Sequence, residues 1–134
     1  MEQSQESHDA PPLVLIVDDH PAIRTMMAHA LHVHGFQPIE AANGREAICW
    51  MEQSARALLY PSLLLLDLAM PVLDGHAFLT WLQSNWVGRY PTPRIILITA
   101  SASDEQLLTY FPIVTHIMPK PFHIRDLVAR CLAS

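Results

Sequence analysis

Short apolar runs alternate along this chain with longer stretches in which apolar residues recur three or four positions apart. The runs have the length of β-strands, and we expect strands at residues 13–17, 36–42, 63–66, 94–99 and 114–118. The run at 63–66 is leucine throughout, with no polar alternation. Such a run is typical of a central strand that is covered on both faces.

The stretches between these runs have the spacing and the boundary residues of helices. We expect helices over residues 21–34, after the turn at 43–44, around 78–86, over 105–111 and over 123–132. Pro21 suits the first turn of a helix, Gly35 suits a helix end, and Ser103 or Asp104 could cap the fourth helix before Pro112 closes it. The expected buried side of the second helix comprises Ala47, Ile48, Met51 and Leu58.

Strand and helix thus alternate five times, without an internal repeat or a linker. This order is typical of an α/β domain with a parallel sheet, and right-handed crossovers make the sheet doubly wound. Ligands of such sheets bind at the carboxyl ends of the strands, where the strand order reverses. We therefore expect the chemistry of this chain beside the ends of the first strand and its neighbour.

Length and composition restrict the class of protein further. The 134 residues suffice for one domain, and residues 1–12 are polar and acidic, so we expect a loose tail there and no secretion signal. No apolar run is long enough for a membrane span. The net charge of −5, without a basic stripe, argues against direct nucleic-acid binding. Cys49 and Cys131 are expected to be free thiols of a cytoplasmic protein.

Charged residues follow three of the expected strands. Asp18 and Asp19 follow the first, Asp67 follows the third, and Lys120 follows the fifth. Because parallel strands end at the same sheet edge, these side chains should lie close together. Carboxylates gathered in this way suit Mg²⁺, which prefers oxygen ligands and leaves positions for phosphate oxygens.

A carboxylate in such a place is also a possible nucleophile toward phosphorus, forming an aspartyl phosphate. Lys120 and the hydroxyl group of Thr99 could then hold the oxygens of the added group. Any single Asp at a strand end is more often a helix cap or a solvated loop residue. Only the joint pattern along one sheet edge favours a binding site.

The same residues lie in motifs of a known family. The motifs are Val-Asp-Asp-His-Pro at 17–21, Asp-Leu-Ala-Met-Pro-Val-Leu-Asp-Gly at 67–75, Thr-Ala at 99–100 and Lys-Pro-Phe at 120–122. In this order they closely resemble the receiver domain of a two-component response regulator. The resemblance implies a flavodoxin-like (βα)5 fold with strand order 2-1-3-4-5, a receiver domain over 13–134, and phosphoryl transfer from a histidine kinase or phosphotransfer protein.

The resemblance also implies a role for each site residue. Asp67 is the phosphoacceptor, Thr99 is the switch hydroxyl, the Ala100 amide is a further donor to the phosphoryl group, and Lys120 is the counter-charge. The implied Mg²⁺ ligands are Asp19, Asp67 and the main-chain carbonyl of Ala69, with Asp18 acting mainly through metal-bound water. The peptide bond between Lys120 and Pro121 is similar to one that is cis in the family.

Two departures from the family pattern concern the signalling surface. Ile117 stands where receivers commonly carry an aromatic switch residue, and residues 110–115 lack the family's glycine. We expect Leu108, Tyr110, Phe111 and Ile117 either to form an apolar patch for a homodimer or an output partner, on the face of residues 105–132, or simply to close the core.

Other chemistry-bearing residues have plainer interpretations. We expect His29, His32 and His34 at the surface, Trp50, Trp81 and Trp86 in packing, and Arg24 on the solvated side of its helix. A Mg²⁺-dependent phosphohydrolase is disfavoured because Ala69 stands where such enzymes carry a second acid. The alternative to a phosphoacceptor is a degenerate receiver that acts only as an interaction or dimerisation module.

Overall fold

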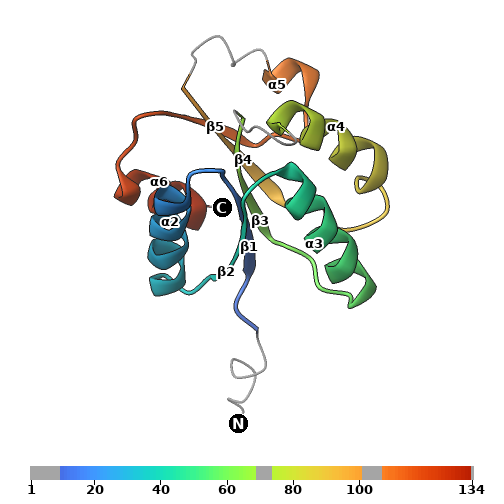
Figure 1. Ribbon diagram of the computed structural model, residues 1–134, viewed down its shortest axis with the longest axis horizontal. Helices are drawn as coiled ribbons and strands as arrows, with labels where there is room; N and C mark the ends of the chain where they lie inside the picture. Colours follow the sequence, from blue (N-terminus) through green and yellow to red (C-terminus); the bar gives the residue numbers. More distant parts are fainter. Residues whose placement is uncertain (1–9, 69–73, 101–106, 134) are drawn as a thin grey trace.

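The computed structural model describes residues 10–68, 74–100 and 107–133 (Figure 1). The strands are β1 (Leu13–Val17), β2 (Gln37–Ala41), β3 (Leu63–Asp67), β4 (Arg94–Thr99) and β5 (His116–Pro119). The helices are α2 (Pro21–Val33), α3 (Gly44–Arg56), α4 (Gly75–Asn85), α5 (Leu107–Tyr110) and α6 (Ile124–Leu132). Among the helices of these ranges, none is both long enough and apolar enough to cross a membrane.

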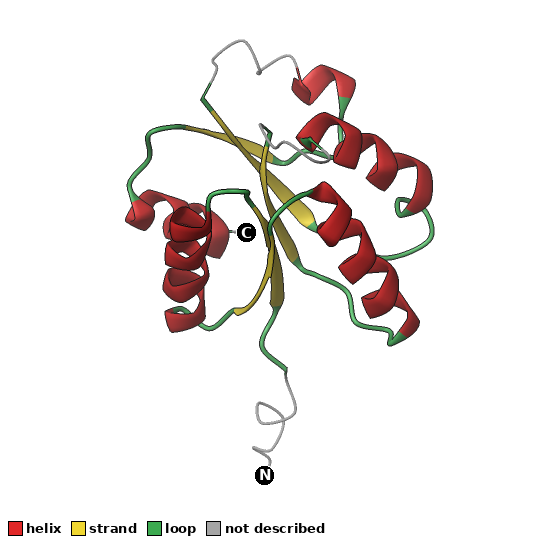
Figure 2. Cartoon of the chain, viewed as in Figure 1, coloured by secondary structure: helices red, strands yellow, loops and turns green. Residues whose placement is uncertain are grey.

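The strands form one parallel sheet in the order β2-β1-β3-β4-β5. Helices α2 and α6 cover one face of this sheet, and α3, α4 and α5 cover the other (Figures 1 and 2). The structure thereby confirms the flavodoxin-like, doubly wound sandwich expected from the sequence. The order reverses at β1, which has β2 on one side and β3 on the other.

The core consists of two apolar layers, one on each face of the sheet. Successive residues of β1 are buried in different layers, because successive side chains of a strand point to opposite faces of the sheet. Leu15 and Val17 pack with α3 and α4, whereas Val14 and Ile16 pack with α2 and α6. All five residues of β3 are buried, which explains the absence of polar alternation in that run.

The starts of the helices agree with the boundary residues of the sequence. Pro21 opens α2. Asn43 caps α3 by accepting a hydrogen bond from the Glu46 amide at 2.9 Å, and the Glu46 carboxylate accepts one from the Ala42 amide at 2.7 Å. Asp74 caps α4 through the Ala77 amide at 2.8 Å. These caps satisfy amides that have no partner within the helix.

The expectation for Leu58 is wrong. Helix α3 ends at Arg56, and Leu58 lies beyond it with a φ of 58° and a side chain that is 75% exposed. The Leu59 amide donates to the Ser54 carbonyl at 2.8 Å and the Leu58 amide to the Ala55 carbonyl at 3.0 Å, which is the Schellman ending of a helix. This ending turns the chain away from the helix, so the apolar spacing does not extend to Leu58.

Other boundaries differ from the expectations by a few residues. Strand β5 begins at His116 rather than at 114, and the described part of α5 is only Leu107–Tyr110. The proposed caps Ser103 and Asp104 lie outside the described residues. The expected surface histidines are exposed, Cys49 and Cys131 are free thiols, and Trp86 is buried with Trp50 and Trp81 packed beside the same core layer. These three interpretations are confirmed.

Candidate phosphoryl and metal site

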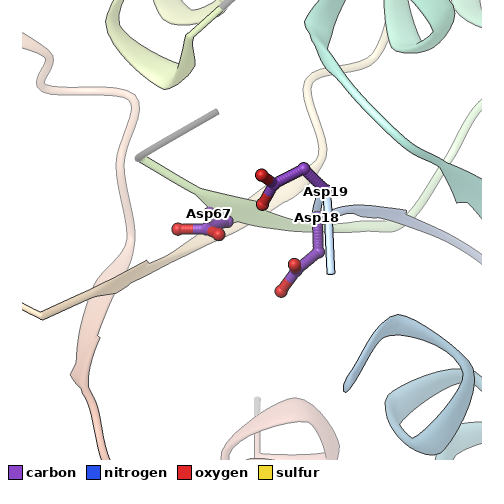
Figure 3. Close-up of side chains that lie close together, drawn as sticks. All are labelled: Asp18, Asp19 and Asp67. Atoms are coloured by element: carbon purple, nitrogen blue, oxygen red, sulfur yellow. The ribbon is translucent and has the colours of Figure 1, made fainter. Parts of the chain in front are cut away.

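Three carboxylates meet at the carboxyl ends of β1 and β3 (Figure 3). Val17 lies beside Leu66 in the parallel register, so the residues that follow, Asp18 and Asp67, reach the same level of the sheet. One carboxylate oxygen from each of Asp18, Asp19 and Asp67 lies within 4.8 Å of the others. We call these residues the acidic triad. The predicted convergence of Asp18, Asp19 and Asp67 is therefore observed.

Asp18 is the most constrained member of the acidic triad. Its amide donates to the Ala41 carbonyl at 3.1 Å, and its Oδ1 accepts a hydrogen bond from the His20 amide at 2.8 Å. Its Oδ2 is buried without a hydrogen-bond partner among the described residues. Burial raises the pKa of the Asp18 carboxyl, and the neighbouring charge of Asp67 adds to that rise.

Lys120 is the cation of the site. Its Nζ lies 3.4 Å from Asp67 Oδ2, and its amide donates to the Thr99 carbonyl at 2.7 Å. The peptide bond between Lys120 and Pro121 is cis, as the resemblance implied. Asp67 is buried and the Lys120 side chain is 36% exposed, so the ammonium reaches Asp67 from the solvent side of the site.

Thr99 and Ala100 complete the sheet edge. Thr99 is the last residue of β4 and is buried, whereas Ala100 is exposed. A cavity of about 490 Å³ opens beside Ala100 and Asp18. It is lined by Asp18, His20, Ile23, Met26, Ala100, Lys120, Pro121 and Phe122. Lys120 and Asp18 therefore face the same open cavity.

The residues of the acidic triad suit a hard divalent cation. Carboxylates at this separation repel one another unless a positive charge lies between or beside them. The buried Oδ2 of Asp18 has no hydrogen-bond donor among the described residues, which fits a metal-bound water or a metal as its missing partner. Ala69, whose carbonyl is the further ligand implied by the resemblance, lies outside the described residues.

Sequence reasoning missed one residue beside the site, Arg24. Its side chain was expected in solvent, but it is only 17% exposed. Its Nη1 donates to the Asp18 carbonyl at 2.7 Å and its Nε donates to Glu40 Oε1 at 3.0 Å. The sequence did contain a signal for this contact. Arg24 lies one helical turn after the two acids, and Glu40, of opposite charge, lies in the next strand.

The surface around Ile117 divides into two parts. Leu108 and Tyr110 are 44% and 68% exposed, while Phe111 and Ile117 are half-buried and pack against the core layer of α3 and α4. The four residues therefore do not form one exposed patch. His116 lies one position before Ile117 in β5, where burial, Arg130 and Arg94 lower its pKa.

A parallel α/β sheet with an acidic triad and a lysine at its carboxyl edge fits a phosphoacceptor signalling domain. Comparison with known families gives a match to the response regulator receiver domain over residues 14–132. The chain therefore belongs to the response regulator receiver domain family. The matched receiver domain is a signalling phosphoacceptor rather than a classical enzyme.

Relatives and solved structures agree with this assignment. The transcriptional regulatory protein TrcR of Mycobacterium tuberculosis is 31% identical over 121 residues, which is 90% of this chain and 44% of TrcR. The chain thus spans less than half the length of this relative. The structure of the chemotaxis protein CheY4 of Vibrio cholerae aligns with a TM-score of 0.71 at 28% identity, covering 91% of this chain and 97% of CheY4. The response regulator TrrA of Thermotoga maritima, solved in complex with Mg²⁺ and BeF, has the same fold with a TM-score of 0.70, 24% identity and coverage of 90% and 96% of the two chains.

Proposed function

We propose that Asp67 of this receiver accepts a phosphoryl group from a histidine kinase or a phosphotransfer protein. The observation that carries the proposal is the pairing of Asp67 Oδ2 with Lys120 Nζ at 3.4 Å inside the acidic triad. An isolated solvent-exposed Asp would have neither a cation beside it nor two further carboxylates. The arrangement supplies both a nucleophile and the charge that its product requires.

The proposed step is a displacement at phosphorus. An oxygen of the Asp67 carboxylate forms the new bond, the bond from phosphorus to the donor nitrogen or oxygen breaks, and its electron pair leaves with the donor. Lys120 then neutralises the added oxygens by a charge-assisted hydrogen bond. The Thr99 hydroxyl and the Ala100 amide are proposed as further donors to the phosphoryl group, because Thr99 ends β4 and Ala100 follows it at the same sheet edge.

Mg²⁺ is the proposed cofactor. Asp18, Asp19 and Asp67 would hold it, with the Ala69 carbonyl added by the family resemblance and Asp18 acting mainly through water. When bound, the cation supplies positive charge that compensates the carboxylates and the phosphoryl oxygens. TrrA, which was solved with Mg²⁺ and BeF, supports this choice of cation.

We assign the receiver to residues 13–134 and regard 1–12 as a tail, in line with the family match over 14–132. Its signal would pass by protein contacts to an output partner or a second copy through α5, β5 and α6, without direct contact with nucleic acid or a membrane. The free thiols of Cys49 and Cys131 support a cytoplasmic location.

The test is phosphorylation of the whole chain by a small donor. The protein is incubated with Mg²⁺ and acetyl phosphate, and intact-mass spectrometry measures the gain of one phosphoryl group. We expect an adduct on the wild type that hydroxylamine removes, as for an acyl phosphate, and none on Asp67→Asn. Asp74→Asn is the matched control, because Asp74 only caps α4 and should leave the adduct unchanged.

A second candidate is a degenerate receiver that works only through protein contacts. It is favoured by Ile117, which replaces the aromatic switch residue and is held half-buried against the core. A wild type that gains no phosphoryl group and does not bind beryllofluoride would support this candidate and refute the first.

A further inference from the structure

Arg24 joins two elements that lie beside the acidic triad. It belongs to α2, and its planar guanidinium donates one hydrogen bond to the Asp18 carbonyl at 2.7 Å and another to Glu40 Oε1 of β2 at 3.0 Å. At 17% exposure, the side chain is largely withdrawn from solvent. The two bonds come from two different nitrogens of the guanidinium, whereas a lysine would offer a single nitrogen to both acceptors.

The hydrogen bonds of Arg24 are made to groups other than the carboxylates of the acidic triad. Its hydrogen-bond partners are a neutral main-chain carbonyl and Glu40, whose negative charge compensates it. Lys120, in contrast, lies against the Asp67 carboxylate. Arg24 therefore holds the backbone of the acidic triad without occupying the carboxylates that a divalent cation requires.

The bond from Arg24 adds the third restraint on Asp18. The Asp18 amide is bound to Ala41 of β2, and Asp18 Oδ1 is bound to the His20 amide. With its carbonyl held by Arg24, both main-chain polar groups of Asp18 and one carboxylate oxygen are engaged. The remaining oxygen, Oδ2, is buried and without a hydrogen-bond partner in the described part of the chain.

We propose that Arg24 is a positioning residue for the metal site, holding the loop of Asp18 and Asp19 against β2 so that the acidic triad is assembled before a cation arrives. This inference rests on the proposed function, because it concerns the affinity for the same Mg²⁺. Partners that orient metal ligands from outside typically change metal affinity by about 10- to 100-fold. Assembling the ligands in advance removes an ordering cost from binding.

The test measures divalent-cation affinity directly, without any phosphoryl transfer. Mn²⁺, which takes the same oxygen ligands, is titrated into each protein and the free ion is measured by electron paramagnetic resonance. We expect Arg24→Ala to weaken Mn²⁺ binding by about tenfold. If Arg24 acted only through its charge, Arg24→Ala would instead bind Mn²⁺ more tightly, because a cation near three carboxylates would be lost. Unchanged or tighter binding by folded Arg24→Ala would overturn the proposal.

Two further variants keep the proposal testable if Arg24→Ala fails to fold. Glu40→Ala removes only the ion pair with Arg24, at a side chain that is 39% exposed, and should also weaken Mn²⁺ binding. Arg24→Lys keeps the charge and should not restore full affinity, so wild-type affinity in Arg24→Lys would contradict the guanidinium geometry. Arg56→Ala, an exposed charge deletion at the far end of α3, is the control and should bind as the wild type.

The outcomes separate this inference from the proposed function. A wild type that binds no divalent cation overturns both. A wild type that binds Mn²⁺ and is phosphorylated, together with an Arg24→Ala protein of equal affinity, overturns only the role of Arg24. Circular dichroism and urea unfolding without metal establish that each variant compared is folded.

Discussion

The ammonium of Lys120 lies 3.4 Å from the carboxylate of Asp67, although Asp67 ends β3 and Lys120 follows β5, with β4 between these two strands. This pairing gives Lys120 two opposing effects on the site. Its charge stabilises phosphoryl oxygens added to Asp67, but it also competes with a divalent cation for the same carboxylate.

Replacement of Lys120 by alanine should therefore change the two properties in opposite directions. We expect Lys120→Ala to accept phosphoryl from acetyl phosphate about a hundredfold more slowly, because a charged donor to the developing charge is lost. The same variant should bind Mn²⁺ more tightly. Intact-mass time courses and metal titrations check the two effects, and Arg125→Ala, an exposed charge deletion in α6, is the control. Parallel losses of both properties would contradict this separation.

Gly75 opens α4 in close contact with the backbone of Asp67 and Leu68. A Cβ atom at this position would lie 2.7 Å from the Leu68 Cα and 3.1 Å from the Asp67 carbonyl oxygen. Both contacts are with backbone, so relief requires a shift of the segment that carries Asp67. We expect Gly75→Ala to lower the free energy of unfolding by about 1–3 kcal/mol in urea titrations, despite the better helix propensity of alanine.

A control for Gly75→Ala is Ser84→Ala, which adds an alanine on the exposed side of the same helix. Its stability should change by less than about 0.5 kcal/mol. The Gly75→Ala protein should also be phosphorylated more slowly, because the Asp67 main chain must move. Normal stability and a normal rate of adduct formation would show that the backbone yields without cost.

Leu58 occupies a left-handed backbone conformation at the end of α3, with a φ of 58°. Glycine is the usual residue at this position of a Schellman ending because it has no Cβ to crowd the following carbonyl. The Leu58 side chain is 75% exposed, so little packing is lost on its removal. We expect Leu58→Gly to raise the free energy of unfolding by about 1 kcal/mol.

The matched control is Leu59→Gly, which removes a leucine that is also exposed but whose φ is not positive. It should destabilise the protein by about 0.5–1 kcal/mol, because glycine only adds freedom to the unfolded chain there. Urea titrations that moved both variants in the same direction would contradict the role assigned to the backbone at Leu58.

Cys131 makes stability sensitive to alkaline pH. Burial raises the pKa of its thiol from the ordinary value of 9.0 to about 11, with a smaller opposing effect of Arg94. Because the folded pKa exceeds the unfolded one, the folded state keeps its proton longer, and stability present below pH 9 is lost as the pH rises toward 11. We expect this one group to remove about 2–3 kcal/mol of stability over that interval.

The comparison for Cys131 is the pH profile of Cys131→Ala. That variant should be less stable at neutral pH but should lose less stability on going to alkaline pH, since no thiol ionises there. Urea unfolding at several pH values measures how the free energy of unfolding changes with pH in each protein. Tyrosines and lysines contribute equally to the wild type and to Cys131→Ala, so the difference between the two slopes reports the thiol. Profiles that remain parallel would show that the thiol is not protected by the fold.

The fold and most of the site follow from local features of the amino-acid sequence. The leucine run before Asp67 is apolar on both faces, so it had to be a covered central strand, and parallel strands bring Asp18, Asp19 and Asp67 to one edge. Family motifs added the Lys120-Pro121 cis bond and the strand order, which periodicity alone does not define.

Tertiary structure alone determined how the flanking side chains are used. Arg24 has a helical position suited to solvent, but Glu40, sixteen residues away, lies close enough to hold its guanidinium over the Asp18 carbonyl. Leu58 continues an apolar spacing, yet the helix ends before it. Spacing along the chain reports which residues share an element, whereas contacts between residues of different elements depend on packing that local sequence does not encode.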